Sequence, residues 1–230
     1  MKYPKVREAV FWYRPNRFVA YCKINGETVK VHVKNTGRCR ELLVEGAKVY
    51  LAQSDNKNRS TLYDLIAVEK NTPKGKLLIN MDSFAPNLAV CEWLEKGGLY
   101  PKGCKVFPEK AFGDSRFDFY VEYKEKKAFV EVKGVTMEEN GIASFPDAPT
   151  LRGIKHLNEL CTALDAGYEA FVVFVVQFEN CLGFKPAREL HKEFADALLS
   201  ARDRGVKVLC YECFVSPDSM NISKEVKLLF

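Results

Sequence analysis

Short runs of alternating apolar and polar residues fill the first third of the chain, and this pattern predicts strands rather than helices. The strand-like segments are residues 17–24, 27–33, 47–53, 61–69 and 76–80. Asn25-Gly26 between the first two segments is typical of a two-residue hairpin turn. A short helical stretch that ends at Leu43 follows the second segment. Five short strands in about 80 residues are typical of a small barrel such as an OB-fold.

The rest of the chain alternates between strand-like and helical patterns. The predicted strands are residues 115–123, 128–133, 170–177 and 206–215, and the predicted helices begin near Pro86 and cover residues 150–166 and 188–204. Residues 170–176 are apolar on both faces, which predicts a central strand. A strand hairpin followed by helix, strand, helix and strand is an α/β order. We therefore predict two domains, residues 1–83 and residues 84–230.

Charge is distributed unevenly between these two parts. The chain of 230 residues has a net charge of +5, but residues 1–83 carry 16 Lys and Arg against 8 Asp and Glu, and residues 84–230 carry 19 against 22. A basic N-terminal domain suits binding to nucleic-acid phosphates, although a surplus of this size is also typical of a surface that only aids solubility. No apolar run approaches the roughly 20 residues of a membrane helix, and the first residues lack the apolar core of a signal peptide. We expect a cytoplasmic protein without membrane contact.

Eight cysteines raise the question of disulfides or bound zinc. Cys210 and Cys213 form the only CxxC motif, and no second pair of Cys or His follows at ligand spacing. Both lie in a predicted strand, which puts their side chains on opposite faces. We interpret most of the cysteines as reduced, buried packing residues, while disulfides of the kind found in hyperthermophiles stay an open alternative.

Two carboxylates lie inside apolar strand-like runs. Asp118 stands between two phenylalanines, and Glu131 stands two residues before Lys133. Polar residues 122–127 between the runs suit a hairpin turn that would bring Asp118 beside Glu131 and Lys133. Asp118 and Glu131 could then bind Mg²⁺ or Mn²⁺, and Lys133 could orient a water or stabilise a pentavalent phosphate. Glu-x-Lys is more often a solvated strand face, but a charge between such apolar strands needs a partner or an ion.

Motifs spread over most of the chain resemble those of one known family. They are Asn35-Thr36-Gly37, Ser115–Phe119, Glu131–Thr136, Phe145–Thr150 and Arg152–Leu157. In this order they resemble the sugar fermentation stimulation protein (SfsA) family. Asp118 and Glu131-x-Lys133 also resemble the active-site motif of PD-(D/E)XK nucleases, with Phe117 where that superfamily usually has Pro. The resemblance implies an α/β (α+β) chain with an OB-like β-barrel and a restriction-endonuclease-like mixed sheet flanked by helices. It implies DNA binding more firmly than cleavage.

Further residues are candidates for auxiliary roles at such a site. They are Glu92, Glu109, Arg152, His156 and Gln177. Each has an ordinary alternative, because a helical glutamate is usually solvated, a histidine is usually at the surface, and a strand-end amide usually bonds to backbone. Arg152 and His156 lie four residues apart at the start of a predicted helix with Thr150 as its N-cap, and a helix N-terminus favours phosphate.

The candidate DNA contacts lie in the basic N-terminal domain. They are Arg17, Asn35, Thr36, Gly37, Arg38, Arg40, Lys57 and Arg59. The turn at residues 35–37 could bring its backbone amides close to a phosphate. Trp12, Tyr13 and Phe18 could stack on bases, and we expect at least two of them to pack in the core instead.

The leading hypothesis is a DNA-binding, Mg²⁺- or Mn²⁺-dependent nuclease. The alternative is a DNA-binding regulator of sugar-metabolism genes without catalysis. The pair of Asp118 and Glu131 favours the enzyme, because a pure binder gains nothing from burying two carboxylates that repel each other. The sequence leaves the preferred form of DNA and the oligomeric state open, and a homodimer is one alternative.

Overall fold

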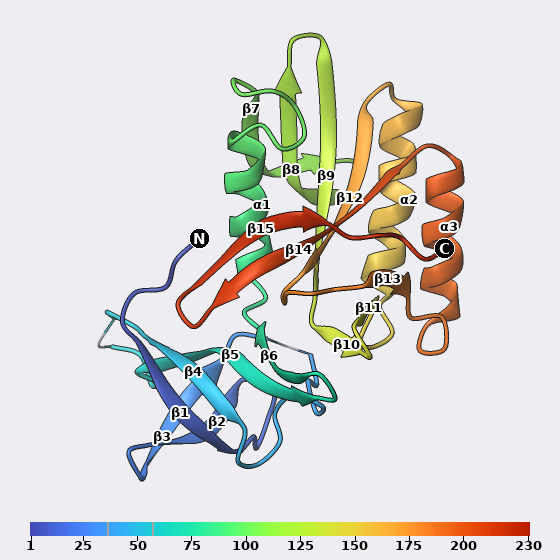
Figure 1. The fold of residues 1–230 in the computed structure, drawn as a ribbon. Helices are drawn as coiled ribbons and strands as arrows, with labels where there is room; N and C mark the ends of the chain where they lie inside the picture. Colours follow the sequence, from blue (N-terminus) through green and yellow to red (C-terminus); the bar gives the residue numbers. More distant parts are fainter. Residues whose placement is uncertain (36, 57) are drawn as a thin grey trace.

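The computed structural model describes residues 1–35, 37–56 and 58–230 and has two domains, with the N-terminal barrel below the C-terminal sheet in Figure 1. The barrel strands are β1 (Val6–Tyr13), β2 (Val19–Ile24), β3 (Glu27–Val33), β4 (Lys48–Gln53), β5 (Tyr63–Thr72) and β6 (Gly75–Asn80). They pair in the order β3-β2-β1-β4-β5-β6, and parallel pairing of β3 with β5 closes a five-stranded barrel. The alternating pattern therefore predicts the architecture of this domain correctly.

Two details of the barrel differ from the prediction. Strand β1 was not predicted, because Arg7 and Glu8 interrupt its apolar pattern and only Ala9 and Phe11 within it are buried. The helical stretch expected before Leu43 is a hydrogen-bonded turn in which the amide of Leu43 donates to the carbonyl of Cys39. A register shift between Phe11 and Tyr13 marks a bulge where β1 pairs with β2.

The C-terminal domain is built on a six-stranded mixed sheet. Its strands are β7 (Lys105–Phe112), β8 (Ser115–Tyr123), β9 (Lys126–Val135), β12 (Glu169–Val176), β14 (Lys207–Ser216) and β15 (Ser219–Glu225), in the order β15-β14-β12-β9-β8-β7. Strand β12 pairs in parallel with both β9 and β14, and the outer pairings are antiparallel. A smaller sheet contains β10 (Met137–Glu139), β11 (Ile142–Phe145) and β13 (Gly183–Pro186).

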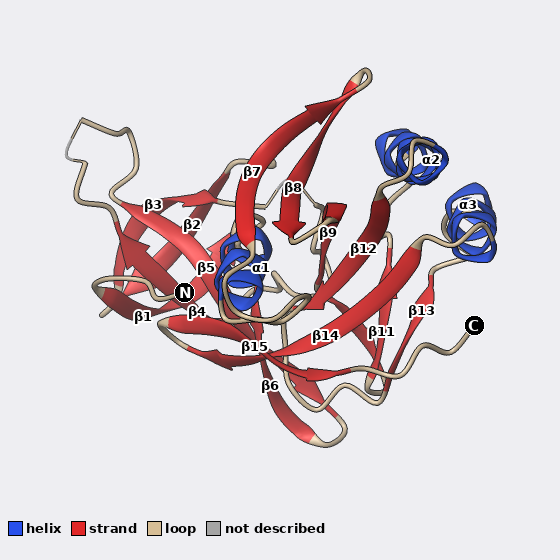
Figure 2. Ribbon diagram, turned by 90° about the horizontal axis from the view of Figure 1, so that it is seen from above, coloured by secondary structure: helices blue, strands red, loops and turns tan. Residues whose placement is uncertain are grey.

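Helices cover both faces of the large sheet. Figure 2 shows α2 (Leu151–Asp165) and α3 (Lys192–Asp203) together on one face and α1 (Ala85–Glu95) on the other. Alternate side chains of β9 enter the two cores, so that Phe129 packs with residues of α2 and Val130 packs with residues of α1. Strand β12 is apolar on both sides, as predicted for a central strand. None of the described helices is long and apolar enough to cross a membrane.

The cysteines pack as separate thiols. All eight are free, and Cys210 and Cys213 are both buried in β14. They belong to different cores on opposite faces of the sheet, as the strand period predicts. Burial raises the pKa of Cys213 to about 12 and also raises that of Cys210, which keeps both thiols protonated.

A buried polar network joins the two domains. The amide Nε2 of Gln177, just after β12, donates to the carbonyls of Asn80 at 3.1 Å and Asp82 at 3.2 Å. The carboxylate of Asp82 accepts from Lys34 Nζ at 2.6 Å and from the hydroxyl of Tyr3 at 3.2 Å. These bonds connect the end of the barrel to the centre of the C-terminal sheet.

Candidate metal and nucleic-acid sites

Asp118 lies where the hairpin of β8 and β9 opens. The ladder pairs Phe119 with Val130, and no pair follows it toward Asp118. One step further in the same register, Asp118 comes opposite Glu131. Its Oδ2 accepts from the backbone amide of Val132 at 2.7 Å, and its Oδ1 accepts from Nδ2 of Asn87 at 2.8 Å. Asp118 is therefore fixed by one bond to β9 and one to α1.

The side chains of β8 change faces of the sheet at Asp118. Phe117 belongs to the core under α2, where it packs against Phe129 with ring centroids 5.2 Å apart. Phe119 belongs to the core under α1. Residues two apart in a regular strand, such as Phe117 and Phe119, would point to the same face of the sheet. Because these two point to opposite faces, β8 is twisted at Asp118. The twist leaves the Asp118 carboxylate at the open end of the ladder.

Glu131 is almost fully buried, and its two oxygens have different environments. Oε1 accepts from Lys133 Nζ at 2.5 Å and also from Nδ1 of His156. Oε2 is buried and accepts no hydrogen bond from any described residue. A buried carboxylate oxygen without a partner is costly, and a bound cation or water would remove that cost. The predicted shared face of Glu131 and Lys133 is therefore present.

His156 is held between Glu131 and Arg152. Arg152 Nε donates to His156 Nε2 at 3.3 Å, so Nδ1 carries the proton that is donated to Glu131. Both residues lie at the start of α2, where Oγ1 of the predicted N-cap Thr150 accepts from the amide of Gly153 at 3.0 Å. The structure therefore brings Arg152 and His156 to the acid pair.

The pKa values of the two carboxylates are shifted in opposite directions. Burial, and next the charge of Glu131, raise the pKa of Asp118, although the amide of Val132 works against this. Burial also raises the pKa of Glu131, but the bond from His156 and the ammonium of Lys133 outweigh it and lower the net value. In the described part of the chain, no group of three or more His, Cys, Asp or Glu side chains is placed so that all of them could hold one metal ion. A metal here would have two carboxylate ligands and complete its shell with waters, which suits Mg²⁺.

The other predicted auxiliary residues have partners elsewhere. Glu92 accepts from the ammonium of Met1 at 2.9 Å, and Glu109 pairs with Arg116 at 3.2 Å on the surface. Gln177 belongs to the junction network. Asn87 was missed by sequence reasoning, and its only sequence signal is an amide one residue after Pro86 in the first turn of a predicted helix.

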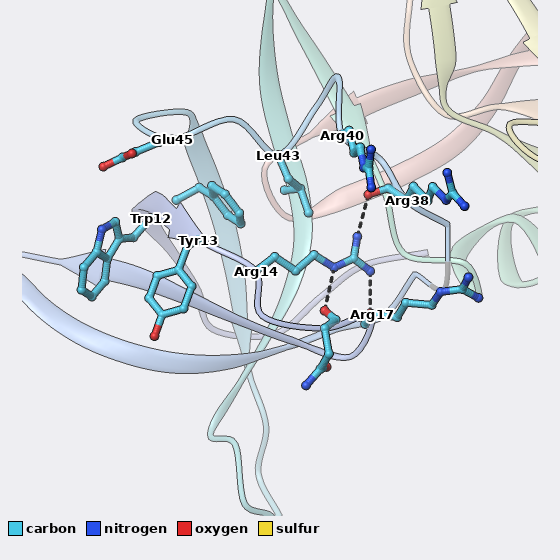
Figure 3. A pocket seen from close by; sticks show the side chains of 10 residues that line it. Trp12, Tyr13, Arg14, Arg17, Arg38, Arg40, Leu43 and Glu45 are labelled. Atoms are coloured by element: carbon cyan, nitrogen blue, oxygen red, sulfur yellow. Dashed lines mark hydrogen bonds between the residues drawn. The ribbon is translucent and has the colours of Figure 1, made fainter.

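A second candidate site is a hollow of about 570 Å³ on the barrel, here called the barrel pocket. Figure 3 shows Trp12 and Tyr13 at one end and Arg17, Arg38 and Arg40 at the other. All five of these side chains are exposed. The pocket brings three of the predicted DNA contacts together.

Arg14 lies between the two ends of the barrel pocket and was not predicted. Its guanidinium donates to five backbone carbonyls, with distances between 2.5 and 3.2 Å. These carbonyls belong to Asn16, Arg17, Asn35, Gly37 and Arg38. Arg14 thus ties together the loops that carry the exposed arginines (Figure 3).

The remaining predicted DNA contacts are placed differently. Arg59 is paired with Asp64 through two bonds of 2.6 and 3.0 Å. Asn35 shapes its own turn, since its Oδ1 accepts from the amide of Gly37 at 2.7 Å. A Cβ on Gly37 would lie 2.5 Å from Oδ2 of Asp147, so glycine permits this loop to approach the C-terminal domain. Thr36 and Lys57 lie outside the described residues.

The expectation that core packing takes up at least two of the three aromatic residues is wrong. Trp12, Tyr13 and Phe18 are 38, 42 and 56% exposed. The bulge in β1 explains why Trp12 and Tyr13 are both exposed. It breaks the alternation of side chains that would turn one of two consecutive residues inward. Phe18 lies in the loop before β2 and contributes to no core.

Comparisons with known proteins agree with this architecture. The family model described as the SfsA N-terminal OB domain matches residues 13–79, and the one described as the sugar fermentation stimulation protein RE domain matches residues 84–219. A sugar fermentation stimulation protein homolog of Ruminiclostridium cellulolyticum is 50% identical over 228 residues, which cover 99% of both chains. A homolog from Desulfitobacterium hafniense strain Y51 is 52% identical over 220 residues, or 96% of this chain and 94% of the other.

A solved structure has the same fold over its whole length. It is described as Pyrococcus furiosus SfsA in complex with Ca²⁺, and its TM-score is 0.89 at 26% sequence identity. The match covers 100% of this chain and 98% of the other. As the order of its motifs predicts, this chain belongs to the sugar fermentation stimulation protein (SfsA) family.

Proposed function

We propose that this protein is a DNA-binding phosphodiesterase that uses Mg²⁺ or Mn²⁺ held by Asp118 and Glu131. The observation that carries the proposal is the buried Oε2 of Glu131, which has no partner among the described residues and lies on the strand next to Asp118. Burial and the charge of Glu131 raise the pKa of Asp118, and a cation between the two carboxylates would relieve this repulsion. Carboxylate oxygens are the ligands that such ions prefer.

The comparison with the Pyrococcus furiosus relative supports a divalent cation. That protein was solved with Ca²⁺, which also takes oxygen ligands. The set Asp118, Glu131 and Lys133 has the order and strand placement of a PD-(D/E)XK site, and the departure at Phe117 leaves it intact, since that position supplies no ligand.

Each residue around the acid pair has a defined task in this proposal. A bound cation would supply Lewis-acid stabilisation of charge on the phosphate. Lys133, whose side chain is 15% exposed, orients the attacking water and stabilises the negative charge of the transition state. His156 holds Glu131 in place, and Arg152 beside it binds a phosphate oxygen at the start of α2. Arg17, Arg38 and Arg40 bind the DNA backbone from the barrel.

The second candidate is a DNA-binding regulator without catalysis. One observation favours it: Oε1 of Glu131 already accepts from both Lys133 and His156. The buried charge is therefore partly compensated without a metal. In that case the acid pair would be a structural site.

A cleavage assay combined with thermal melting separates the two functions. Of single-stranded, duplex and branched DNA, at least one form should be cleaved with millimolar Mg²⁺ or Mn²⁺ and left intact in EDTA. The same ions should raise the melting temperature of the wild type, because they bind only the folded site. Asp118→Ala should abolish both effects. Asp114→Ala removes an exposed acid in the turn before β8 and is the matched control.

Two results together would contradict the enzyme. They are the absence of metal-dependent cleavage of every DNA form and equal melting shifts in the wild type and Asp118→Ala. That combination would favour the regulator over the enzyme.

A further inference from the structure

We infer that the barrel pocket binds single-stranded DNA, with an unpaired base stacked on Trp12 and the flanking phosphates on Arg17, Arg38 and Arg40. The inference specifies the form of DNA in the proposed function and rests on that function for the choice of DNA. The pocket lies on the barrel, whereas Asp118 and Glu131 lie on the sheet of the other domain.

The aromatic end of the pocket is pre-ordered. The rings of Trp12 and Tyr13 meet edge to face with centroids 4.8 Å apart. Tyr13 stacks on Tyr21 at 4.8 Å with an interplanar angle of 13°. The bulge in β1 holds both side chains outward, so they lose little conformational freedom when a ligand covers them. Exposed and ordered ring faces are what a nucleic-acid base needs for stacking.

The opposite end of the pocket supplies charge without compensation. None of the exposed side chains of Arg17, Arg38 and Arg40 forms a salt bridge with a described residue. Glu45 is the one acid among the described residues that line the hollow. The guanidinium of Arg14 donates to backbone carbonyls and so holds the loops that carry the exposed arginines, instead of contacting a ligand. The pocket therefore favours an anion that also carries a flat apolar ring.

An unpaired strand satisfies both ends and a duplex does not. In a duplex each base face is covered by its neighbours, so a protein that touches the backbone cannot also stack on a base. A single strand can turn one base toward Trp12 while its phosphates reach the arginines. The volume of about 570 Å³ lies within the range of sites that enclose one small ligand, and a nucleotide is of that size.

The loop next to the arginine end of the pocket also contacts the C-terminal domain. Gly37, next to Arg38, lies against Asp147 of the C-terminal domain. Gly37 and Gly134 line one cavity of about 160 Å³ between the domains, and Gly134 follows Lys133 directly. In this inference, a strand anchored in the barrel pocket passes the cavity between the domains on its way to the acid pair.

Tryptophan fluorescence provides a direct test, because the chain has only two tryptophans. In a Trp93→Phe background, Trp12 is the sole reporter. In EDTA, oligo(dT) should quench the fluorescence of Trp12. A blunt duplex of the same length should bind with an affinity lower by about tenfold or more. Trp12→Ala should weaken binding of labelled oligo(dT) about tenfold or more, and Trp12→Phe should retain most of the affinity. Phe107→Ala, which removes an exposed aromatic from β7, is the control.

The arginine end is tested by salt dependence. Arg38→Ala combined with Arg40→Ala should reduce the slope of log affinity against log salt by about 1.4, or about 0.7 for each phosphate contact with a single strand. An unchanged slope would place the phosphates elsewhere and overturn the assignment of this end.

Three further results would overturn the inference. They are equal affinity for duplex and single strand, unchanged binding in Trp12→Ala, and binding of dTMP as tight as that of oligo(dT), which would indicate a mononucleotide site. All binding is measured without metal, so Trp12-dependent binding of oligo(dT) would stand even if no DNA is cleaved. Conversely, metal-dependent cleavage that Trp12→Ala leaves unchanged would contradict only the pocket.

Discussion

At the scale of single residues, the acid pair is organised by the partner of each oxygen. Both oxygens of Asp118 accept bonds, from Asn87 and from the amide of Val132. Glu131 accepts two bonds at Oε1, and its Oε2 has no partner among the residues that the structure describes. This arrangement fixes the direction of both carboxylates before any ion binds. In the proposed function, such preorganisation lowers the cost of assembling the site around a phosphate.

Lys133 provides the sharpest test at this scale. Lys133→Ala should reduce cleavage by roughly a hundredfold or more and leave DNA affinity nearly unchanged, because the ammonium acts mainly in the transition state. Lys133→Arg should not restore activity, since a planar guanidinium cannot replace a compact ammonium in a tight site. Single-turnover cleavage and DNA binding in EDTA measure the two effects. Lys127→Ala alters an exposed lysine of the same strand and serves as control.

A parallel loss of binding and cleavage in Lys133→Ala would assign the residue to ground-state binding of DNA. It would contradict a role in the chemical step.

The sequence predicts those residues of the site that a single hairpin brings together. The alternation in β8 and β9 and the polar turn between them are local, so they predict that Asp118 lies beside Glu131 and Lys133. Asn87 arrives with a helix packed on the sheet, and no local pattern places it there. Glu92 and Glu109 have suitable chemistry, but the ammonium of Met1 and the guanidinium of Arg116 neutralise them where they stand.

At the scale of elements, the close approach of α1 to β9 sets the geometry of the acid pair. Gly134 makes this approach possible, because a Cβ there would lie 2.5 Å from Oε1 of Gln177 and 2.8 Å from Cγ of Pro86. Asn87 follows Pro86 and bonds to Asp118. The glycine in β9 therefore acts on the site through the position of a helix.

Gly134→Ala should lower the free energy of unfolding by roughly 1 to 3 kcal/mol, the usual cost of overpacking a core. Denaturant unfolding measures this loss. The metal-induced rise in melting temperature should also shrink, since α1 and Asn87 are pushed away from Asp118. Stability equal to or above that of the wild type would show that the junction accommodates the methyl group and would contradict this account.

The elements that sequence patterns predict well are long or buried on both faces. Strand β12 and helix α2 have strong periodicity and were predicted to within about one residue at each end. Apart from β1, the strands that were not predicted are short or lie at sheet edges, where polar residues are tolerated on both faces; they are β7, β10, β11, β13 and β15. Their pairing is decided by the rest of the fold rather than by their own pattern.

At the scale of the whole molecule, the junction fixes the barrel relative to the sheet. Asp82 is 1% exposed and binds Lys34 of the barrel, while Gln177 reaches back to Asn80 from the end of β12. The individual residues are ordinary polar side chains, so the sequence offers no sign that they form one network. The network matters for the proposed function because the barrel pocket and the acid pair must contact the same DNA.

Asp82→Ala tests this coupling. The variant leaves Lys34 and the hydroxyl of Tyr3 without their acceptor, so the free energy of unfolding should fall by roughly 2 to 3 kcal/mol; the side chain of Lys34 is 26% exposed and can still be partly hydrated. The carbonyls of Asn80 and Asp82 accept from Gln177 of the sheet, and Asp82→Ala removes the side chain that anchors this segment to the barrel. Cleavage of long DNA should therefore fall more than binding of oligo(dT), because each site stays intact while the two domains are held together less firmly. Asp55→Ala is the control, because it breaks only the exposed pair with Lys5. It should leave the free energy of unfolding and the cleavage of long DNA unchanged within error. Full stability and full cleavage in Asp82→Ala would show that the apolar contacts between the domains suffice to hold them in register.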